Sequence, residues 1–157
     1  MKNYRKVTAV LLLVLAHFAA NAQTNTDSPL LKEAKKAIAA SNATYFVDFA
    51  KNDGSIVNHY ADDACLLFPN SPILCGHAEL AKFFKDGYEK YGLRSGKFIT
   101  KNIYGDGRKY VTEEGLWQSI DASGKVFDDG KFLVLWKKTK NGWKMFRDSF
   151  SSSRPQK

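Results

Sequence analysis

The stretch that decides the fold runs from residue 96 to residue 151 and reads GKFITKNIYGDGRKYVTEEGLWQSIDASGKVFDDGKFLVLWKKTKNGWKMFRDSFS. Three turn signals divide it: Gly105-Asp106-Gly107, Asp121-Ala122-Ser123-Gly124 and Asn141-Gly142. Such residues supply the positive φ that tight hairpin turns need. The pattern therefore predicts strands at about 96–104, 108–120, 126–138 and 143–151, joined by consecutive hairpins into an antiparallel sheet.

The residues ahead of this sheet predict a long helix at about 28–51. From Leu31 onward, side chains recur at three- and four-residue steps, which is typical of one helix face. This face carries Leu31, Ala34, Ile38, Asn42, Tyr45 and Phe49. Pro29 suits the first turn of such a helix, and Gly54 suits its end.

Shorter elements are predicted between the long helix and the sheet. A second helix is expected at about 55–60, and a third follows the apolar pattern of residues 80–91 until Gly92 ends it. Between them, residues 65–68 and 73–75 are typical of a small hairpin bounded by prolines. The predicted class is α+β, with about three helices and six strands and with the helices against one face of the sheet.

Two cysteines, Cys65 and Cys75, flank the turn of the small hairpin. A three-residue turn at 69–71 would place them opposite each other and allow a disulfide. A two-residue turn would break that register and leave two buried thiols on adjacent strands. Both arrangements stay open, and an oxidising compartment would favour the disulfide.

The first 22 residues have the pattern of a cleavable signal peptide. Three basic residues precede a run from Val7 to Ala16 that is apolar apart from Thr8, and Ala20-Asn21-Ala22 follows as a small-x-small cleavage site. The apolar run is too short to span a bilayer. We therefore expect a mature chain that begins near Gln23 and is periplasmic or secreted. An uncleaved N-terminal anchor is the alternative.

Charge and composition argue against several classes of function. The predicted leader holds three of the 24 basic residues, which leaves 21 against 16 acidic residues, a net charge of +5. Because this charge is dispersed, nucleic-acid binding is not expected. His59 and His77 stand too far apart for a metal-ligand pair, and the chain has no glycine-rich phosphate loop. We expect no metal, no cofactor, no nucleic acid and, after cleavage, no membrane.

Five segments resemble a known family in their order and spacing. They are 45–54 (YFVDFAKNDG), 60–70 (YADDACLLFPN), 76–80 (GHAEL), 130–138 (GKFLVLWKK) and 142–148 (GWKMFRD). The family is the nuclear transport factor 2-like superfamily, in its SnoaL-like and ketosteroid-isomerase-like group, and in particular an exported branch of unknown function. The resemblance implies a mature N-terminal segment at 23–33 and a domain at 34–153. In that domain a curved antiparallel sheet would wrap around the long helix into a cone with an apolar pocket.

The resemblance also allows a test of isomerase chemistry. Ketosteroid isomerases of this group carry a carboxylate base directly before a proline, and Phe68 stands at that place here. A phenyl ring cannot accept a proton, so this mechanism is not expected. The family's phenolic donor on the first helix is matched by Tyr45. The acid that shares the oxyanion hole would fall at 131–133, where there is none.

Polar residues on apolar faces predict anchors in the pocket. Asn42 lies on the inward stripe of the long helix, and Arg147 shares strand parity with bulky Trp143 and Met145, which indicates the inner face. Asp148 has the opposite parity and would share the surroundings of Arg147 only if a bulge intervened. A buried arginine needs an acidic partner, which would be a ligand or an internal acid.

The predicted ligand is accordingly a small apolar or acidic molecule, and the internal acids considered for Arg147 are Glu114 and Asp48. No catalytic residue is predicted. The predicted ligand-binding residues are Asn42, Tyr45, Phe49, Tyr60, Phe68, Phe84, Tyr88 and Arg147.

The fold implied by the resemblance is compatible with three functions. Binding of a small molecule is favoured by the pocket. The alternatives are a lyase or isomerase on a polyketide- or steroid-like substrate, and a structural dimerisation domain whose cone is filled by aromatic side chains.

A homodimer is expected through the outer face of the sheet. Residues 132–136 (FLVLW) are apolar on both strand parities, and Phe146 and Phe150 would extend the outer patch. The alternative is that residues 23–33 or the tail after Phe150 fold over this patch.

Overall fold

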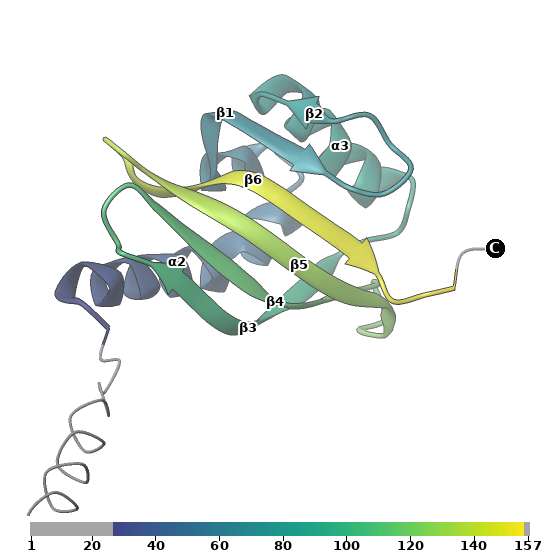
Figure 1. Ribbon diagram of the computed structural model, residues 1–157. Helices are drawn as coiled ribbons and strands as arrows, with labels where there is room; N and C mark the ends of the chain where they lie inside the picture. Colours follow the sequence, from purple (N-terminus) through teal and green to yellow (C-terminus); the bar gives the residue numbers. More distant parts are fainter. Residues whose placement is uncertain (1–26, 156–157) are drawn as a thin grey trace, which may run out of the picture.

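The computed structural model describes residues 27–155, and Figure 1 shows their arrangement. The elements are α2 (Pro29–Ala50), the 3₁₀ helix η2 (Ser55–His59), β1 (Tyr60–Leu67), β2 (Leu74–Cys75), α3 (His77–Glu89), β3 (Ser95–Gly105), β4 (Tyr110–Ile120), β5 (Val126–Thr139) and β6 (Gly142–Ser152). The six strands form one sheet, and α2 and α3 lie on the same side of it (Figure 1). The predicted leader and the cleavage site before Gln23 lie outside the described residues.

The strand order of the sheet is β2-β1-β6-β5-β4-β3. The last four strands are joined by hairpins at the three predicted turns, so they pair antiparallel. β1 runs parallel to β6, with Leu66 opposite Asp148, and this makes the sheet mixed rather than antiparallel. Turn signals reveal only neighbours joined by a hairpin, and the pairing of β1 with β6 has no such signal in the sequence.

Helix α2 follows the predicted periodicity closely. The hydroxyl of Ser28 caps its start by accepting a hydrogen bond from the backbone N–H of Leu31 at 3.1 Å, and Pro29 occupies the first turn. Five of the six predicted inward positions are buried: Leu31, Ala34, Ile38, Tyr45 and Phe49. The exception is Asn42, which is half-buried.

The predicted second helix is a five-residue 3₁₀ turn. It begins at Ser55, after Gly54 in the left-handed conformation with φ 85°, and no side chain caps its start. The extended backbone of Tyr60 ends it, so no room remains for an α-helical turn. Residues 27–155 therefore contain two α-helices rather than about three. Neither of them is long and apolar enough to cross a membrane.

The core lies between the helices and one face of the sheet. β5 alternates along its centre, since Phe132, Val134 and Trp136 are buried while Leu133 is 49% exposed on the outer face. The largest fully buried side chains are Trp136, Ile38, Leu66, Leu80, Met145, Glu113 and Val111. One of these, Glu113, is an acid.

A bulge in β6 reverses the predicted orientation of its second half. Trp136 pairs with Met145 and Leu135 pairs with Arg147, so Phe146 is an extra residue in the ladder. Met145 points inward before the bulge, and Asp148 points inward after it. The prediction that Arg147 shares the inner face with Met145 is therefore wrong, because the parity changes at Phe146.

The small hairpin has the register that a three-residue turn was expected to give. Cys65 lies opposite Cys75 across β1 and β2, and the two sulfur atoms form a disulfide. No free cysteine occurs in the described part of the chain. The disulfide closes the loop 68–73, whose Phe68 packs on Phe150 near the end of β6.

Candidate functional site

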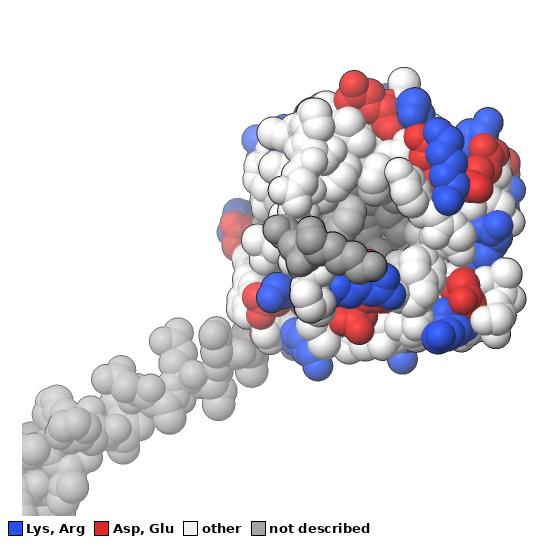
Figure 2. Space-filling model, turned by 90° about the vertical axis from the view of Figure 1, so that its right-hand side faces the viewer, with Lys and Arg blue, Asp and Glu red and all other residues white. Residues whose placement is uncertain are grey.

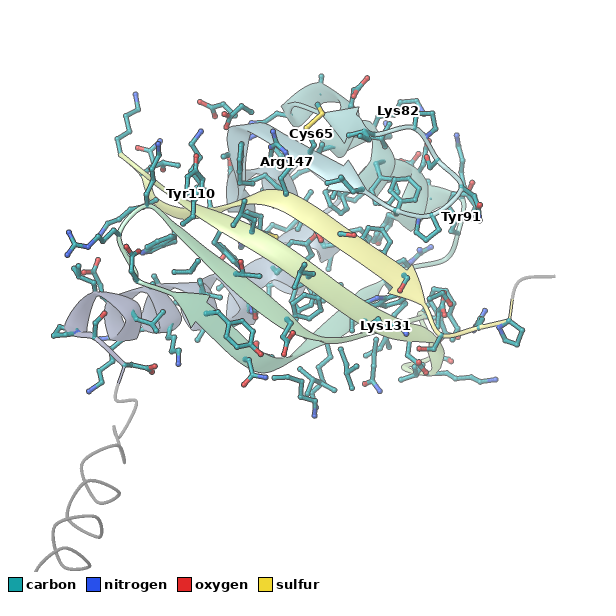
Figure 3. The ribbon with its side chains drawn as sticks, in the orientation of Figure 1. Cys65, Lys82, Tyr91, Tyr110, Lys131 and Arg147 are labelled. Carbon is teal, nitrogen blue, oxygen red and sulfur yellow. A yellow bond between two sulfur atoms is a disulfide. The ribbon has the colours of Figure 1, made fainter. Side chains whose placement is uncertain are left out.

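A pocket of about 720 Å³ lies between the sheet and the two helices. It opens at the end of the molecule that Figure 2 faces, where the surface is hollowed. Figure 3 labels Lys82 and Tyr91 at this end. The wall is dominated by aromatic side chains: Tyr45, Phe46, Phe49, Phe68, Phe83, Phe84, Tyr91, Phe98, Trp117, Phe127, Phe132 and Phe150. Such a pocket suits a small apolar ligand.

Three hydrogen-bonding side chains meet at this pocket, each from a different element. Tyr60, at the start of β1, donates its hydroxyl proton to Asp148 Oδ2 on β6 at 2.8 Å. The hydroxyl of Tyr45 on α2 lies 2.7 Å from that of Tyr60. Since Tyr60 has one proton and uses it on the carboxylate, Tyr45 must donate to Tyr60. Tyr45 and Asp148 also line the pocket.

The surroundings of these three hydrogen-bonded side chains determine which of them ionise. Burial raises the pKa of Asp148 to about 6, although the hydrogen bond from Tyr60 lowers it and the charge of Glu113 raises it further. Burial, together with the nearby charge of Asp148, raises the pKa values of Tyr45 and Tyr60 well above their usual range. Both phenols therefore stay neutral donors at physiological pH, while the carboxyl group titrates close to it.

The structure brings most of the predicted aromatic residues to this pocket. Tyr45, Phe49, Phe68 and Phe84 line it, and Tyr60 contacts it through its hydrogen bonds. Tyr88 is not among the lining residues; it packs against Phe49 and beneath the guanidinium of Arg94.

Asn42 faces inward, as predicted, but it is bound to the protein. It donates to Glu113 Oε1 at 2.8 Å, and Thr100 donates to the same oxygen at 2.6 Å. Trp136 Nε1 donates to Glu113 Oε2 at 2.9 Å. Burial raises the pKa of Glu113, and the three hydrogen bonds oppose that rise. Asn42 lies outside the aromatic pocket, so its prediction as a ligand anchor there is wrong.

Arg147 lies on the outer face of the sheet, where Figure 3 labels it. Its Nη1 donates to the backbone carbonyl of Asp63 at 3.0 Å, and its guanidinium covers the ring of Phe146 at 3.7 Å. It forms no ion pair with Glu114 or Asp48 in the described residues. Neither predicted role of Arg147, as a ligand anchor or as half of a buried ion pair, agrees with this position.

Asp148 is the pocket residue that sequence reasoning missed. Strand parity placed it on the outer face, and no residue in the sequence signals the bulge at Phe146. Eight aromatic wall residues were also missed as site residues, and these are Phe46, Phe83, Tyr91, Phe98, Trp117, Phe127, Phe132 and Phe150. The pairing of β1 with β6, which has no signal in the sequence, sets Asp148 beside Leu66, which faces the core.

A second polar cluster joins α2 to η2. His59 Nδ1 lies 2.7 Å from Ser41 Oγ, and His59 Nε2 lies 3.0 Å from Asp48 Oδ2. This order of serine, histidine and aspartate resembles a catalytic triad, but Ser41 lies inside a helix, where backbone N–H groups are already bonded and cannot form an oxyanion hole. Burial lowers the pKa of His59. We interpret the cluster as a structural link.

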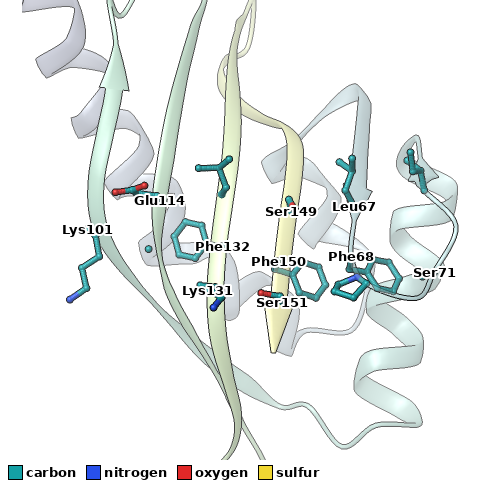
Figure 4. Close-up of a pocket in the computed structure, with 14 residues that line it drawn as sticks. Leu67, Phe68, Ser71, Lys101, Glu114, Lys131, Phe132, Ser149, Phe150 and Ser151 are labelled. Carbon is teal, nitrogen blue, oxygen red and sulfur yellow. The ribbon is translucent and has the colours of Figure 1, made fainter. Parts of the chain in front are cut away.

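A groove of about 600 Å³ lies on the outer face of the sheet (Figure 4). Its polar side chains are those of Ser71, Lys101, Glu114, Lys131, Ser149 and Ser151. It shares Phe68, Ser71, Phe132 and Phe150 with the interior pocket, and Phe68 stacks on Phe150 at 5.5 Å. These rings separate the two hollows. Within residues 27–155 no group of three or more His, Cys, Asp or Glu side chains is arranged to hold a metal ion.

No family model matches this chain, and no curated protein matches its sequence. Several solved structures share its fold. A ketosteroid isomerase-like protein from Erwinia carotovora atroseptica has 21% identity and a TM-score of 0.59, over 76% of this chain and 96% of that one. An NTF-2 like protein of unknown function from Shewanella oneidensis has 18% identity and a TM-score of 0.62, over 74% and 98%.

A third structure, an NTF2-like superfamily protein from Salmonella enterica, has 14% identity and a TM-score of 0.60, over 80% of this chain and 95% of that one. These likenesses show that the chain has the nuclear transport factor 2-like α+β fold. At such identities they show the fold alone, and function must be argued from the site.

Proposed function

We propose that this protein binds a small, mostly apolar molecule in the pocket inside a cone formed by its sheet and helices. The observation that supports this most is a 720 Å³ aromatic pocket that ends at a buried hydrogen-bonded chain of Tyr45, Tyr60 and Asp148. A structural dimerisation domain with a filled cone would have no such space. The few polar groups would fix the orientation of the ligand, as in most small-molecule sites.

Native mass spectrometry of freshly purified protein tests the binding proposal. We expect a co-purified small molecule that is lost from the Ser119→Trp variant, in which an indole would fill the pocket. Gln118→Trp is the matched control, because Gln118 is the next residue on the same strand and does not line the pocket. Equal occupancy in both variants would show that the ligand binds elsewhere.

A second candidate function is acid–base catalysis by Asp148, in the manner of an isomerase or lyase. The observation that favours it is a carboxyl group with a pKa of about 6 that lines an apolar pocket beside a neutral phenol, Tyr45. Such a group would exchange a proton at carbon next to a ketone. Deuterium exchange into 2-tetralone in D₂O tests this, and loss of exchange in Asp148→Asn would support it.

We also propose export of the mature chain through its predicted signal peptide. The Cys65–Cys75 disulfide is consistent with an oxidising compartment. N-terminal sequencing of protein from an exporting host should find a start near Gln23. A chain that retains Met1 would contradict export with cleavage.

A homodimer through the outer face of the sheet completes the proposal. Leu116 and Leu133 are 42% and 49% exposed there, and Leu133 lines the groove on this face. Phe146 also lies on this face, whereas Phe150 turns inward after the bulge and does not extend the patch. Light scattering should give twice the mass of the mature chain at tens of micromolar; the mass of a single chain would exclude the dimer.

A further inference from the structure

The deep end of the pocket offers hydrogen-bond acceptors and no free donor. The hydroxyl of Tyr60 donates its hydrogen bond to Asp148, and the hydroxyl of Tyr45 donates its hydrogen bond to Tyr60. Oδ1 of Asp148 accepts no hydrogen bond from residues 27–155. Trp117 Nε1 on the wall has no partner, but it is shielded from solvent and so is closed to a ligand. A ligand atom that reaches Asp148 must therefore be a donor.

The carboxylate of Asp148 also lacks a cation. None of the ion pairs among the described residues includes it. The charge that acts on it, that of Glu113, belongs to another acid. Asp148 is only 8% exposed, and an ionised carboxylate so deeply buried is costly unless a positive charge accompanies it.

The walls next to Asp148 are suited to a positive charge. Aromatic rings attract cations through the negative electrostatic potential of their faces, and most strongly where water is excluded. The rim does not reverse this preference, since it carries charges of both signs (Figure 2), and Lys82 is paired with Asp86 at 2.7 Å. Discrimination between ligands would therefore arise at the deep end of the pocket.

We propose that the pocket recognises a protonated amine with an apolar, bicyclic-sized body, whose ammonium group binds Asp148 Oδ1 while the body packs on the aromatic wall. This inference rests on the proposed binding function and names its ligand class. It replaces the acidic ligand that Arg147 suggested, because Arg147 lies outside the pocket and an acid lines its depth. A carboxylate ligand would meet Asp148 as a like charge.

Three indoles of similar size test the inference, and their side chains end in an ammonium, a hydroxyl or a carboxylate group: tryptamine, tryptophol and indole-3-acetate. Calorimetric titration of the full protein at pH 7.5 should give tryptamine at least tenfold tighter binding than tryptophol, with indole-3-acetate weakest. In Asp148→Asn, tryptamine should fall to the affinity of tryptophol, while tryptophol changes less than threefold. Ser149→Ala, on the outer face beside it, is the matched control and should keep the preference.

The outcomes separate the two proposals. Equal binding of tryptamine and tryptophol by the native protein overturns the amine inference and leaves the binding function in place. The same holds if the tenfold preference survives in Asp148→Asn. If none of the three indoles binds and no small molecule co-purifies with the protein, both proposals fail.

Discussion

Residues 27–155 bury two acids that pair with no cation, Glu113 and Asp148, and the surroundings of the two acids differ. Glu113 accepts three hydrogen bonds from Asn42, Thr100 and Trp136, so both of its oxygens are occupied. Asp148 accepts one hydrogen bond from Tyr60, and its other oxygen is left for the pocket. A buried acid whose hydrogen bonds are complete holds a structure together, whereas one with a free oxygen beside a cavity is a binding group.

The largest expected effect on stability is at Glu113, whose two oxygens are both hydrogen-bonded. Glu113→Ala leaves the buried indole N–H of Trp136 and the partly buried donors of Asn42 and Thr100 without their acceptor, and it should lower the free energy of unfolding by about 3 to 5 kcal/mol. Urea denaturation measures the loss. The neighbouring Glu114→Ala is the control, because Glu114 lies on the outer face and accepts only exposed hydrogen bonds. If both variants lose equally little, Glu113 is not structural.

Asp148, the acid at the pocket, should instead lower the stability of the protein at neutral pH, where it is ionised. Its pKa rises from 3.8 when unfolded to about 6 when folded, so the stability it contributes is complete below pH 3.8 and is lost as pH rises through 6. The loss is about 3 kcal/mol at 1.36 kcal/mol per pKa unit. Asp148→Asn should remove this part of the pH dependence and be more stable than wild type at pH 7.5.

Denaturation curves between pH 3.5 and pH 7.5 measure this difference, and subtracting the Asn variant removes the other titrating groups. The titratable neighbours to consider are Glu113, Tyr45 and Tyr60. Parallel curves for the two proteins would mean that Asp148 is not buried as an ionisable group.

Loss of the disulfide should destabilise the region around the pocket and Asp148 more than the region around Glu113. Cys65→Ala with Cys75→Ala opens a loop of ten residues and should cost about 2 to 3 kcal/mol. Because this loop carries Phe68 on the pocket wall, amide exchange should rise in β1 and β2 but not around Glu113 in β4. A uniform rise would show that the disulfide acts on the whole domain.

The smallest effect is expected outside both sites. Arg147→Ala removes a hydrogen bond to Asp63 and a cation–π contact with Phe146, at a cost below about 1 kcal/mol. Ligand affinity should not change. A tenfold loss of tryptamine binding in this variant would place Arg147 at the site after all.

The sequence predicted the strands and the long helix well because both rest on local signals. The glycines of the three turns set the ends of β3 to β6, and the spacing from Leu31 to Phe49 set α2. Long-range pairing left no such mark, so the parallel contact of β1 with β6 and the mixed sheet were not predicted.

The candidate site was predicted only in part, for the same reason. Tyr45 and Phe49 follow helix periodicity, so their inward direction was readable. The bulge at Phe146 depends on how β5 and β6 fit together in three dimensions. It exchanged the faces of Arg147 and Asp148, and with them the expected charge of the ligand.

The most direct test of the central claim is a carboxyl ¹³C NMR titration of the protein with and without saturating tryptamine. We predict that Asp148 titrates near pH 6 in the free protein and that its midpoint falls by at least one pH unit when the amine is bound, while Glu113 does not respond. An unchanged midpoint for Asp148, or an equal shift for Glu113, would contradict the assignment of Asp148 as the group that binds the ligand.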